Sequence, residues 1–546
     1  MLSPKTLGYT ASAINQASPG VASNAVAFGN VRIDSTQNQP LSVGNVATTA
    51  PQASLDAQLG AVTGAATSNG GTLTQLAPGA TNGSNLVVGL GTGTAGAQSG
   101  SVTINLQSDS MPNGCTSHCT VGLASETVNV SGNVYRLANP TLNTTSVNLG
   151  AARVGGTAPM ATISVTNTSS DPYTECLAAT FGAAPTGFTS SGSIAKLAAQ
   201  GTDGTSLHVA LDTATAGTFT GNQAVNFTSN GAIDNAIPEA VGSGSVALTG
   251  EVYTPAVAQV NTTSPIGFGI VHVGDGGGSL SQSISVTNSA AITALNDTLL
   301  GSIMVSGAPF SGSGSLGTSG LAAGETSTAM NVDLSTATAG IYNGTASAAF
   351  ASHDADLADL GLAGASFGVS AQVNNYAALA FTFASGLGSL TGSAATGYTL
   401  NLGSLEQNSG IGMSVLAFLN DNPLSEQAFT DLLSSTGSIV SGSGFSLSGD
   451  SVSGLAGGTS QGGFDIGLDT SKLGAFDELL AFDVSSSNGS GFDQKIGTVN
   501  LTLKDDVVAA ASSVPEPGSL DLLGAGLLVL GVVTGRHPVR PRRKTS

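Results

Sequence analysis

The amino-acid sequence predicts an all-β protein made of tandem antiparallel sandwich domains, followed by a short carboxyl-terminal transmembrane helix. Three observations support the sandwiches: apolar and polar residues alternate in short runs, small turn-forming residues separate the runs, and the pattern recurs about every 120 residues. Such alternation is typical of strands with one buried face. Because 546 residues correspond to about three or four domains of ordinary size, the length agrees with a tandem array.

The repeat is defined by landmarks that occur in the same order in each copy. The first landmark glycines are Gly29, Gly150 and Gly269, and the asparagines that end the next strand are Asn45, Asn167 and Asn288. Successive glycines are 121 and 119 residues apart, and successive asparagines are 122 and 121 apart. An alternating strand closes each copy, at residues 128–132, 246–250 and 367–371. A fixed order at a fixed spacing indicates three tandem copies.

A fourth, more divergent copy follows the third. Its landmark glycine is Gly403, 134 residues after Gly269, so the copy contains extra residues. Part of the extra length is residues 422–433, where apolar positions recur at helical spacing behind an Asn-Pro start. The sequence therefore predicts one short helix inserted in the fourth copy.

Each copy has the length of a two-sheet sandwich of the immunoglobulin-like kind, without the cysteine and tryptophan spacing of antibody domains. The predicted organisation is a leader or linker at 1–23, sandwich repeats at 24–137, 138–256, 257–378 and 379–508, a linker at 509–513, and a terminal segment at 514–546.

Charge is scarce and strongly acidic. Only 8% of the residues are charged, against about 25% in an average globular protein. The formal charge is −20, and five of the thirteen basic residues lie in the last eleven positions, which leaves −25 over residues 1–535. A surface of this sign repels a phosphate backbone, so nucleic acid is not an expected partner.

The terminal segment has three parts in a fixed order. The motif Val514, Pro515, Glu516 and Pro517 comes first, and its prolines favour an extended, exposed backbone. An apolar run follows; from residue 518 to 535 it would form a helix of about 27 Å, at the short limit for crossing a bilayer. The basic residues that close the chain are Arg536, Arg540, Arg542, Arg543 and Lys544. They would hold that end in the cytoplasm and leave the repeats outside.

This segment resembles the PEP-CTERM sorting signal of Gram-negative bacteria over about 33 residues. The resemblance implies that exosortase, a membrane-embedded cysteine protease-transpeptidase, recognises Pro515, Glu516 and Pro517 and processes the chain on its way to the cell surface or extracellular matrix. It also implies an inner-membrane stage before processing and an association with exported exopolysaccharide. The repeats are similar to choice-of-anchor D repeats, which resemble immunoglobulin-like domains of the ASPM, SPD-2 and Hydin type.

Export requires an amino-terminal signal. Residues 1–20 contain no apolar run of the length that a secretory signal needs. Either the natural start lies upstream of Met1 or the signal is missing, and the terminal segment favours the first alternative because it has no use in a cytosolic protein.

The chemical motifs in the sequence are weak. Residues 91–96 fit a dinucleotide-binding glycine pattern but precede an alternating strand instead of a helix, and residues 458–462 fit a nucleophile elbow without its flanking strand and helix. The acids of residues 353–359 could offer oxygens to calcium, but the segment lacks the glycine and final glutamate of an EF-hand loop. We expect solvated loops at all three places.

The three cysteines are too few for a disulfide scaffold. Cys115 and Cys119 either close a small loop as a disulfide or remain thiols, and Cys176 is left unpaired. With His118 between them they suggest zinc, yet a fourth ligand at suitable spacing is missing.

The sequence therefore predicts an exported, non-enzymatic surface or matrix protein, with no metal, cofactor or catalytic residue. The alternative is a surface adhesin or polysaccharide-binding protein, although a chain without tryptophan is poorly suited to stacking sugars.

Overall fold

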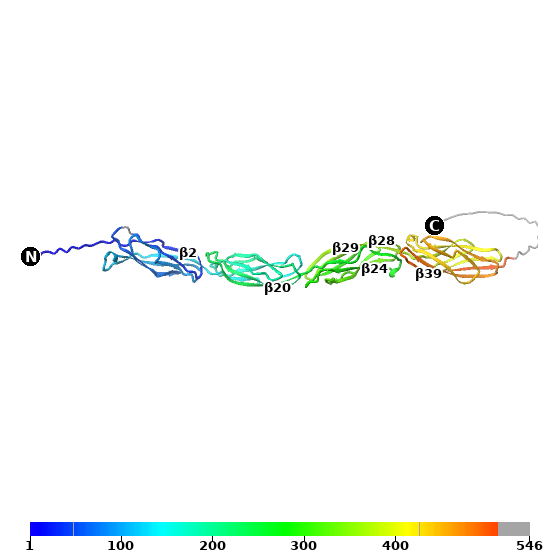
Figure 1. Cartoon of the computed structure of the whole chain (residues 1–546), viewed down its shortest axis with the longest axis horizontal. Helices are drawn as coiled ribbons and strands as arrows, with labels where there is room; N and C mark the ends of the chain where they lie inside the picture. The colour runs from blue at the N-terminus through cyan, green and yellow to red at the C-terminus, as the bar shows by residue number, and fades with distance from the viewer. Residues whose placement is uncertain (47–48, 425, 512–546) are drawn as a thin grey trace, which may run out of the picture.

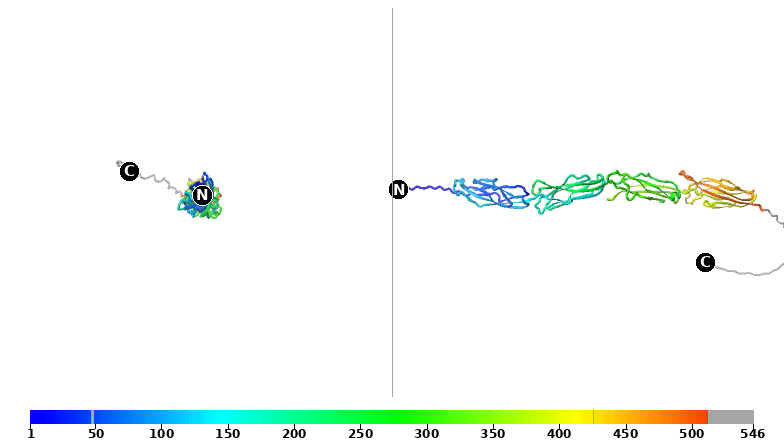
Figure 2. Two further views of the ribbon diagram at one scale, coloured as in Figure 1. Left: turned by 90° about the vertical axis from the view of Figure 1, so that its left-hand side faces the viewer. Right: turned by 90° about the horizontal axis from the view of Figure 1, so that it is seen from below.

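The structure is a computed structural model that describes residues 1–46, 49–424 and 426–511. Four β-sandwiches follow one another in a row and form a thin rod (Figure 1). Seen from one end, the sandwiches lie behind one another, and a view from below shows the same straight row (Figure 2). The sandwiches are numbered here as repeats 1 to 4 in chain order.

Repeat 1 divides its strands among three sheets. Its elements are β1 (Pro19–Val21), β2 (Ala25–Arg32), β3 (Gln37–Pro40), β4 (Val43–Asn45), β5 (Ser54–Gly64), β6 (Ala66–Ser68), β7 (Thr72–Leu76), β8 (Thr81–Asn82), β9 (Val87–Leu90), β10 (Gly96–Asp109), the 3-10 turn η1 (Met111–Asn113), β11 (Thr120–Gly122) and β12 (Glu126–Tyr135). The sheet orders are β1-β4-β8, β3-β9-β6 and β2-β12-β10-β5-β7, with β11 paired to β10. The buried core of this repeat begins at Ala17, inside the range expected to be a leader.

Repeat 2 has two sheets, ordered β13-β15-β19-β17 and β14-β21-β20-β16-β18. Its strands are β13 (Pro140–Leu142), β14 (Ser146–Arg153), β15 (Met160–Asn167), β16 (Leu177–Phe181), β17 (Phe188–Ser191), β18 (Ser193–Leu197), β19 (Thr202–Leu211), β20 (Gly217–Ser229) and β21 (Glu239–Tyr253).

Repeat 3 has two four-stranded sheets, β22-β24-β27-β26 and β23-β29-β28-β25. Its elements are β22 (Ala258–Val260), β23 (Ile266–His272), the 3-10 turn η2 (Asp275–Gly277), β24 (Ser279–Asn288), β25 (Thr298–Ser306), β26 (Phe310–Ser313), β27 (Thr326–Ser335), β28 (Gly340–Asp354) and β29 (Leu357–Asn374).

Repeat 4 has sheets β30-β33-β37-β35 and β31-β32-β39-β38-β34-β36. Its elements are β30 (Leu379–Gly386), β31 (Ser389–Ser393), β32 (Gly397–Glu406), β33 (Ile411–Asn420), the 3-10 turn η3 (Gln427–Phe429), β34 (Leu432–Ser441), β35 (Phe445–Ser448), β36 (Ser451–Leu455), β37 (Ser460–Asp469), β38 (Gly474–Ser487) and β39 (Asp493–Val508).

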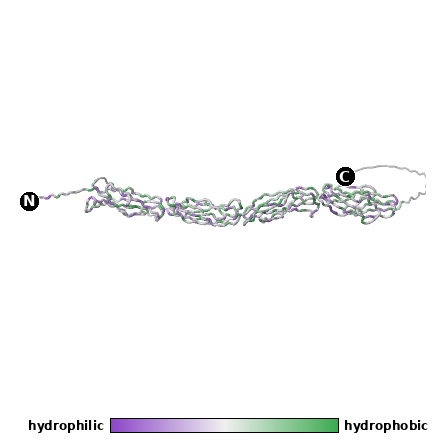
Figure 3. Tube along the Cα trace, viewed as in Figure 1, coloured by the Kyte–Doolittle hydropathy of each residue, from purple (hydrophilic) through white to green (hydrophobic). Residues whose placement is uncertain are grey.

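Each repeat has its own apolar core between its sheets. In the strands the buried residues alternate with exposed ones, and the hydropathy alternates along the chain trace (Figure 3). Repeat 4 differs from the others by an aromatic centre in which Phe418, Phe464 and Phe482 are at most 1% exposed. Burial of about 25 cal/mol for each Å² of apolar surface is the main stabilising contribution in sandwiches of this kind.

The landmark glycines mark a bulge in a parallel strand pair. In every repeat the strand that carries the glycine runs parallel to the last long strand, as β14 does to β21, and the register shifts at the glycine. Gly29, Gly150 and Gly269 all have φ of +72°, a left-handed conformation that glycine adopts at little cost. The bulge sets which residue ends the strand, three positions after the glycine.

The landmark asparagines are buried hydrogen-bonding centres. Asn167 is fully buried, and its Nδ2 donates to the backbone oxygens of Glu175 at 2.9 Å and Leu197 at 3.1 Å. Its Oδ1 accepts from the backbone N–H of Asn139, in the segment that enters the repeat. Asn45, Asn288 and Asn420 are buried in the same way. The side chain thus ties the entering segment to the loop that precedes Leu177.

Two helix predictions are corrected by this fold. The described residues form strands, turns and three 3-10 turns, and none of their helices is long and apolar enough to cross a membrane. The segment 514–546, on which the transmembrane helix was expected, lies outside the described residues. The short helix expected at residues 422–433 was wrong: only Gln427–Phe429 form a 3-10 turn, and Leu433 is a fully buried strand residue of β34.

Candidate functional site

The three junctions between repeats are built alike, and each contains a connected group of buried polar side chains. We call them the first, second and third joints. At each joint the last strand of one repeat continues through a single linker residue that forms a parallel bridge with the next repeat. At the first joint the backbone N–H of Arg136 donates to the backbone oxygen of Tyr173 at 3.1 Å, and the backbone N–H of Glu175 donates to the backbone oxygen of Arg136 at 2.9 Å. The linker is therefore part of the next sandwich.

The first joint is closed by a buried ion pair. Arg32 ends β2 of repeat 1, and its guanidinium donates from Nε and Nη2 to the two carboxylate oxygens of Glu175 in repeat 2, at 2.5 and 2.9 Å. The Glu175 side chain is fully buried and that of Arg32 is 17% exposed. The third guanidinium nitrogen reaches the exposed Glu239 at 3.1 Å. Paired, two-pronged contacts of this kind fix orientation as well as distance.

The second joint repeats this arrangement with different residues. Arg153 ends β14, and its Nε donates to Oδ2 of the buried Asp297 at 2.5 Å. Two further nitrogens of Arg153 donate to the backbone oxygens of Ala358 at 2.8 Å and Ser352 at 3.3 Å. One arginine thus holds three separate segments of repeat 3.

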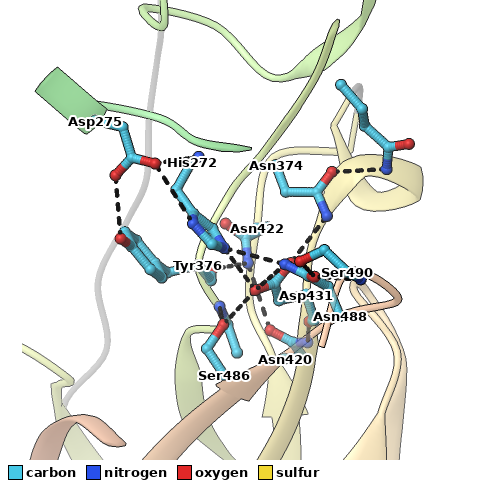
Figure 4. A network of polar contacts seen from close by, with 12 residues as sticks. His272, Asp275, Asn374, Tyr376, Asn420, Asn422, Asp431, Ser486, Asn488 and Ser490 are labelled. Atoms are coloured by element: carbon cyan, nitrogen blue, oxygen red, sulfur yellow. Dashed lines mark hydrogen bonds and ion pairs between the residues drawn. The ribbon is translucent and has the colours of Figure 1, made fainter. Parts of the chain in front are cut away.

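The third joint uses histidine where the others use arginine (Figure 4). His272 ends β23, and its Nε2 lies 2.8 Å from Oδ2 of the fully buried Asp431 in repeat 4. Asn374 and Asn488 donate to Asp431 Oδ1 at 2.9 and 3.0 Å. The imidazole stacks on Tyr376, with ring centroids 4.1 Å apart and planes 7° apart.

A serine links each buried carboxylate to the entering chain. Ser229 Oγ donates to Glu175 at 2.6 Å and accepts from the backbone N–H of Ala138 at 2.8 Å. Ser352 and Ser486 make the equivalent pair of contacts at the second and third joints. The four connected groups at each joint are therefore a cation or histidine, a carboxylate, a serine and a linker.

The joints keep two of their carboxylates ionised. Burial alone would raise the pKa of Glu175, but hydrogen bonds from Arg32 and Ser229 outweigh it and hold that pKa below its ordinary value. Burial likewise opposes ionisation of Asp431, and the donors Asn374 and His272 reverse the balance and lower its pKa. An ionised buried carboxylate depends on these donors, so it couples the two repeats.

The two outer ends of the row carry different residues at the equivalent positions. In repeat 1 the entering residue is Asn15, and the backbone N–H of Ala53 donates to its backbone oxygen, as that of Glu175 does at the first joint. Ala53 therefore has a methyl group where Glu175 has its carboxylate. In repeat 4 the residue that ends the parallel strand is Glu406, which replaces the cation. Two copies placed end to end would therefore have neither the cation nor the buried carboxylate that form the internal joints.

Of the site residues predicted from the sequence, only Cys115 and Cys119 fall in the part of the chain that the structure describes, and they lie away from the joints. The motif Val514 to Pro517 and the basic residues 536–544 lie outside the described residues. Cys115 and Cys119 form a disulfide in the loop that connects η1 to β11, and Cys176 is a free, half-buried thiol. His353 and Asp359 pair with each other at 2.7 Å, and within the described ranges no three metal-ligating side chains converge.

Two shallow hollows occupy equivalent places in repeats 1 and 2. Both lie beside the landmark bulge, at Gly29 in repeat 1 and Gly150 in repeat 2, and both are lined mainly by small or polar residues. The hollow in repeat 2 also contains Phe219 and Glu251, and Asp356 of repeat 3 completes its rim.

The joint residues were not predicted from the sequence, although one signal for them is present. Arg32, Arg153 and His272 all stand three positions after a landmark glycine. The carboxylates give no comparable signal, because Glu175, Asp297 and Asp431 follow their landmark asparagines by 8, 9 and 11 residues.

Topology and joints together define the class of protein: a tandem array of β-sandwich domains with closed interdomain joints. No family model and no curated protein matches the chain. Among solved structures it is similar to a protocadherin γB4 extracellular domain, with 12% identity, 90% of this chain and 67% of that chain covered, and a TM-score of 0.34. It is also similar to the titin I-band fragment I67–I69, with 11% identity, 68% and 99% covered, and a TM-score of 0.22. A PapD-like domain of human CEP192 matches with 12% identity, 25% and 98% covered, and a TM-score of 0.15.

Proposed function

We propose that the chain is an exported, non-enzymatic surface or extracellular-matrix protein whose four repeats serve as a stiff spacer. The observation that supports a spacer is the set of joints, in which a buried carboxylate of one repeat is bound by a side chain of the repeat before it. Domains joined by flexible linkers reorient freely, and a small polar interface does not prevent this. Here the backbone N–H and the backbone oxygen of the linker residue both form hydrogen bonds with the next repeat. Bending would therefore break backbone and side-chain contacts together.

The spacer proposal is tested by the shape of the chain in solution. We expect small-angle scattering to give a maximum dimension that matches four sandwiches in a straight row, as in Figure 1. The double variant R32M/R153M should shorten the average dimension, because it removes the guanidinium groups from two joints. A scattering curve that requires a broad range of interdomain angles for the unmodified chain would contradict a stiff spacer.

The proposal also includes processing by exosortase, for which the support is the terminal sequence alone. Pro515, Glu516 and Pro517 resemble the recognition element of the PEP-CTERM signal, and an apolar run and a basic end follow them in the order that this signal has. The expected destination is the surface or matrix of a Gram-negative bacterium, beside exported polysaccharide.

Processing is tested with the full chain, fused to a secretory signal and expressed with or without an exosortase. We expect the mature product to lose the basic residues 536–544 only when the exosortase is present, as measured by intact mass. The variant E516A should stop the processing, whereas D521A, four residues beyond the motif's last proline, should not. Equal processing of both variants, or of the chain without exosortase, would contradict the assignment.

The alternative function is that of an adhesin or polysaccharide-binding protein, and the repeated hollows are the feature that would serve it. Their linings offer hydroxyl and amide groups but only one aromatic ring, that of Phe219. Saturable binding of purified exopolysaccharide that is lost in a T220A/T249A variant would favour this alternative.

A further inference from the structure

The third joint differs from the other two in one respect that changes its chemistry. Arginine is charged at every physiological pH, so the first and second joints are permanent ion pairs. Histidine is the side chain that ordinarily changes charge between pH 5 and 8. His272 occupies the position of Arg32 and Arg153, three residues after the landmark glycine and at the end of the same parallel strand.

Both ring nitrogens of His272 face a carboxylate. Nε2 lies 2.8 Å from Asp431 Oδ2, and Nδ1 lies 3.7 Å from Asp275 Oδ2. A neutral imidazole carries one N–H, so it donates to one of these oxygens and turns a lone pair toward the other. An imidazolium has an N–H on each nitrogen and directs one toward each carboxylate. The Nδ1 contact is longer than a hydrogen bond, and Asp275 Oδ2 accepts the backbone N–H of His272 instead. The preference for the protonated ring therefore rests on charge, because a positive ring lies between two carboxylates.

The remaining groups around the ring do not compete for this charge change. Tyr376, which stacks on the imidazole, stays neutral because burial and the charge of Asp275 raise the pKa of its hydroxyl. Phe492 covers the ring from the hairpin between β38 and β39. The amides of Asn374 and Asn488 bind Asp431 and do not titrate, and Nδ2 of Asn488 also lies 3.3 Å from Nε2 of His272.

Burial makes the charge state matter. The His272 side chain is 5% exposed and that of Asp431 is not exposed. When the ring is neutral, a buried carboxylate faces it without a countercharge and depends on neutral donors. When the ring is protonated, the joint becomes a buried ion pair like the two that contain arginine, and charge-assisted hydrogen bonds are about twice as strong as neutral ones.

We propose that the third joint is a pH-sensitive hinge, which is tight when His272 is protonated and looser when the imidazole is neutral, while the first two joints are insensitive to pH over the same range. The rod would then bend preferentially between repeats 3 and 4 when the imidazole is neutral and straighten when it is protonated. This inference concerns the described repeats and does not depend on processing or on the cellular destination of the chain.

Amide hydrogen exchange on the full chain tests the hinge, because each joint has its own reporter amides. At the third joint these are the N–H groups of Asn375 and Asp431, which are bonded across the linker. The equivalent reporters at the first joint are Arg136 and Glu175. Protection factors, which correct for the intrinsic effect of pH on exchange, are compared between pH 5.5 and pH 8.

We expect protection at the third joint to fall by about 3- to 10-fold from pH 5.5 to pH 8, where tenfold corresponds to one pK unit of linkage. Protection at the first joint should not change. The variant H272R should keep high protection at both pH values, and H272Q should show low protection that does not respond to pH.

Three results would overturn the proposal: unchanged protection at the third joint across this range, an equal change at the first joint, or a pH response that persists in H272Q. Core amides of β37 report whether H272Q still folds. If they lose protection, H272R decides the question, because a pH response that survives the arginine would equally refute the role of His272.

Discussion

The variant R32M tests whether a buried ion pair holds repeats 1 and 2 together. Methionine keeps much of the apolar stem of the side chain but removes both guanidinium bonds to Glu175, at 2.5 and 2.9 Å. The carboxylate stays fully buried, with Ser229 and the N–H of Gly231 as its remaining donors. Breaking a buried pair by removing one partner typically costs about 3–5 kcal/mol, and the two surviving donors place this case near about 3 kcal/mol.

The cost should appear as local opening of the first joint. A loss of about 3 kcal/mol corresponds to roughly a hundredfold lower protection of the linker amides, since about 1.4 kcal/mol is a factor of ten. Amide hydrogen exchange at Arg136 and Glu175 measures it directly. Amides in the core of repeat 1 should keep their protection, because the pair does not belong to that core.

A matched control is available one residue beyond the last strand of repeat 1. Arg136 pairs with Asp171 at 2.8 Å, but the two side chains are 38% and 36% exposed, and an exposed pair contributes about 0–1 kcal/mol. R136M should therefore change joint protection by less than about fivefold. Equal effects of R32M and R136M would refute the claim that burial of Glu175 gives the pair its strength.

Three further predictions concern the same architecture. The variant S352A should lower the free energy of opening of the second joint by about 1–3 kcal/mol. Asp297 Oδ2 then loses a donor at 2.7 Å, while Asp297 Oδ1 already lacks a hydrogen-bond partner. The change should be measured as faster exchange of the Asp297 amide. Acid should open the first and third joints. The lowered pKa values of Glu175 and Asp431 give stability that is complete above about pH 4.3, their ordinary unfolded range, and is lost as pH falls through the lower folded values. Scattering should therefore show additional bending in that acidic window, and E175Q should remove the first joint's share. G150A should lower the unfolding free energy of repeat 2 by about 1–2 kcal/mol. The cause is backbone strain alone, because φ of Gly150 is +72° and an added Cβ meets no atom within 4 Å. An unchanged midpoint of unfolding in urea would contradict this prediction.

The wrong helix at residues 422–433 shows where local pattern fails. The apolar spacing is helical, but the sandwich takes Leu433 into strand β34, where it is fully buried, and leaves Leu424 88% exposed. A strand there completes a six-stranded sheet, whereas a helix would leave the neighbouring strands without backbone partners. Tertiary pairing therefore overrode the local preference.

The sequence by itself determined the all-β character of the repeats and the positions of their structural landmarks. These depend on short-range information: alternation with a period of two, glycine at a bulge with positive φ, and a buried asparagine at the end of a strand.

Only the tertiary structure decided which side chains join one repeat to the next. The partners Arg32 and Glu175 are 143 residues apart, Arg153 and Asp297 are 144 apart, and His272 and Asp431 are 159 apart. Each carboxylate lies in a loop whose length varies between repeats, so its distance in sequence from the landmark asparagine is not constant. The carboxylate joins two repeats because the end of one sandwich buries the loop of the next. A buried charge needs a partner in direct contact, and that partner is distant in the sequence.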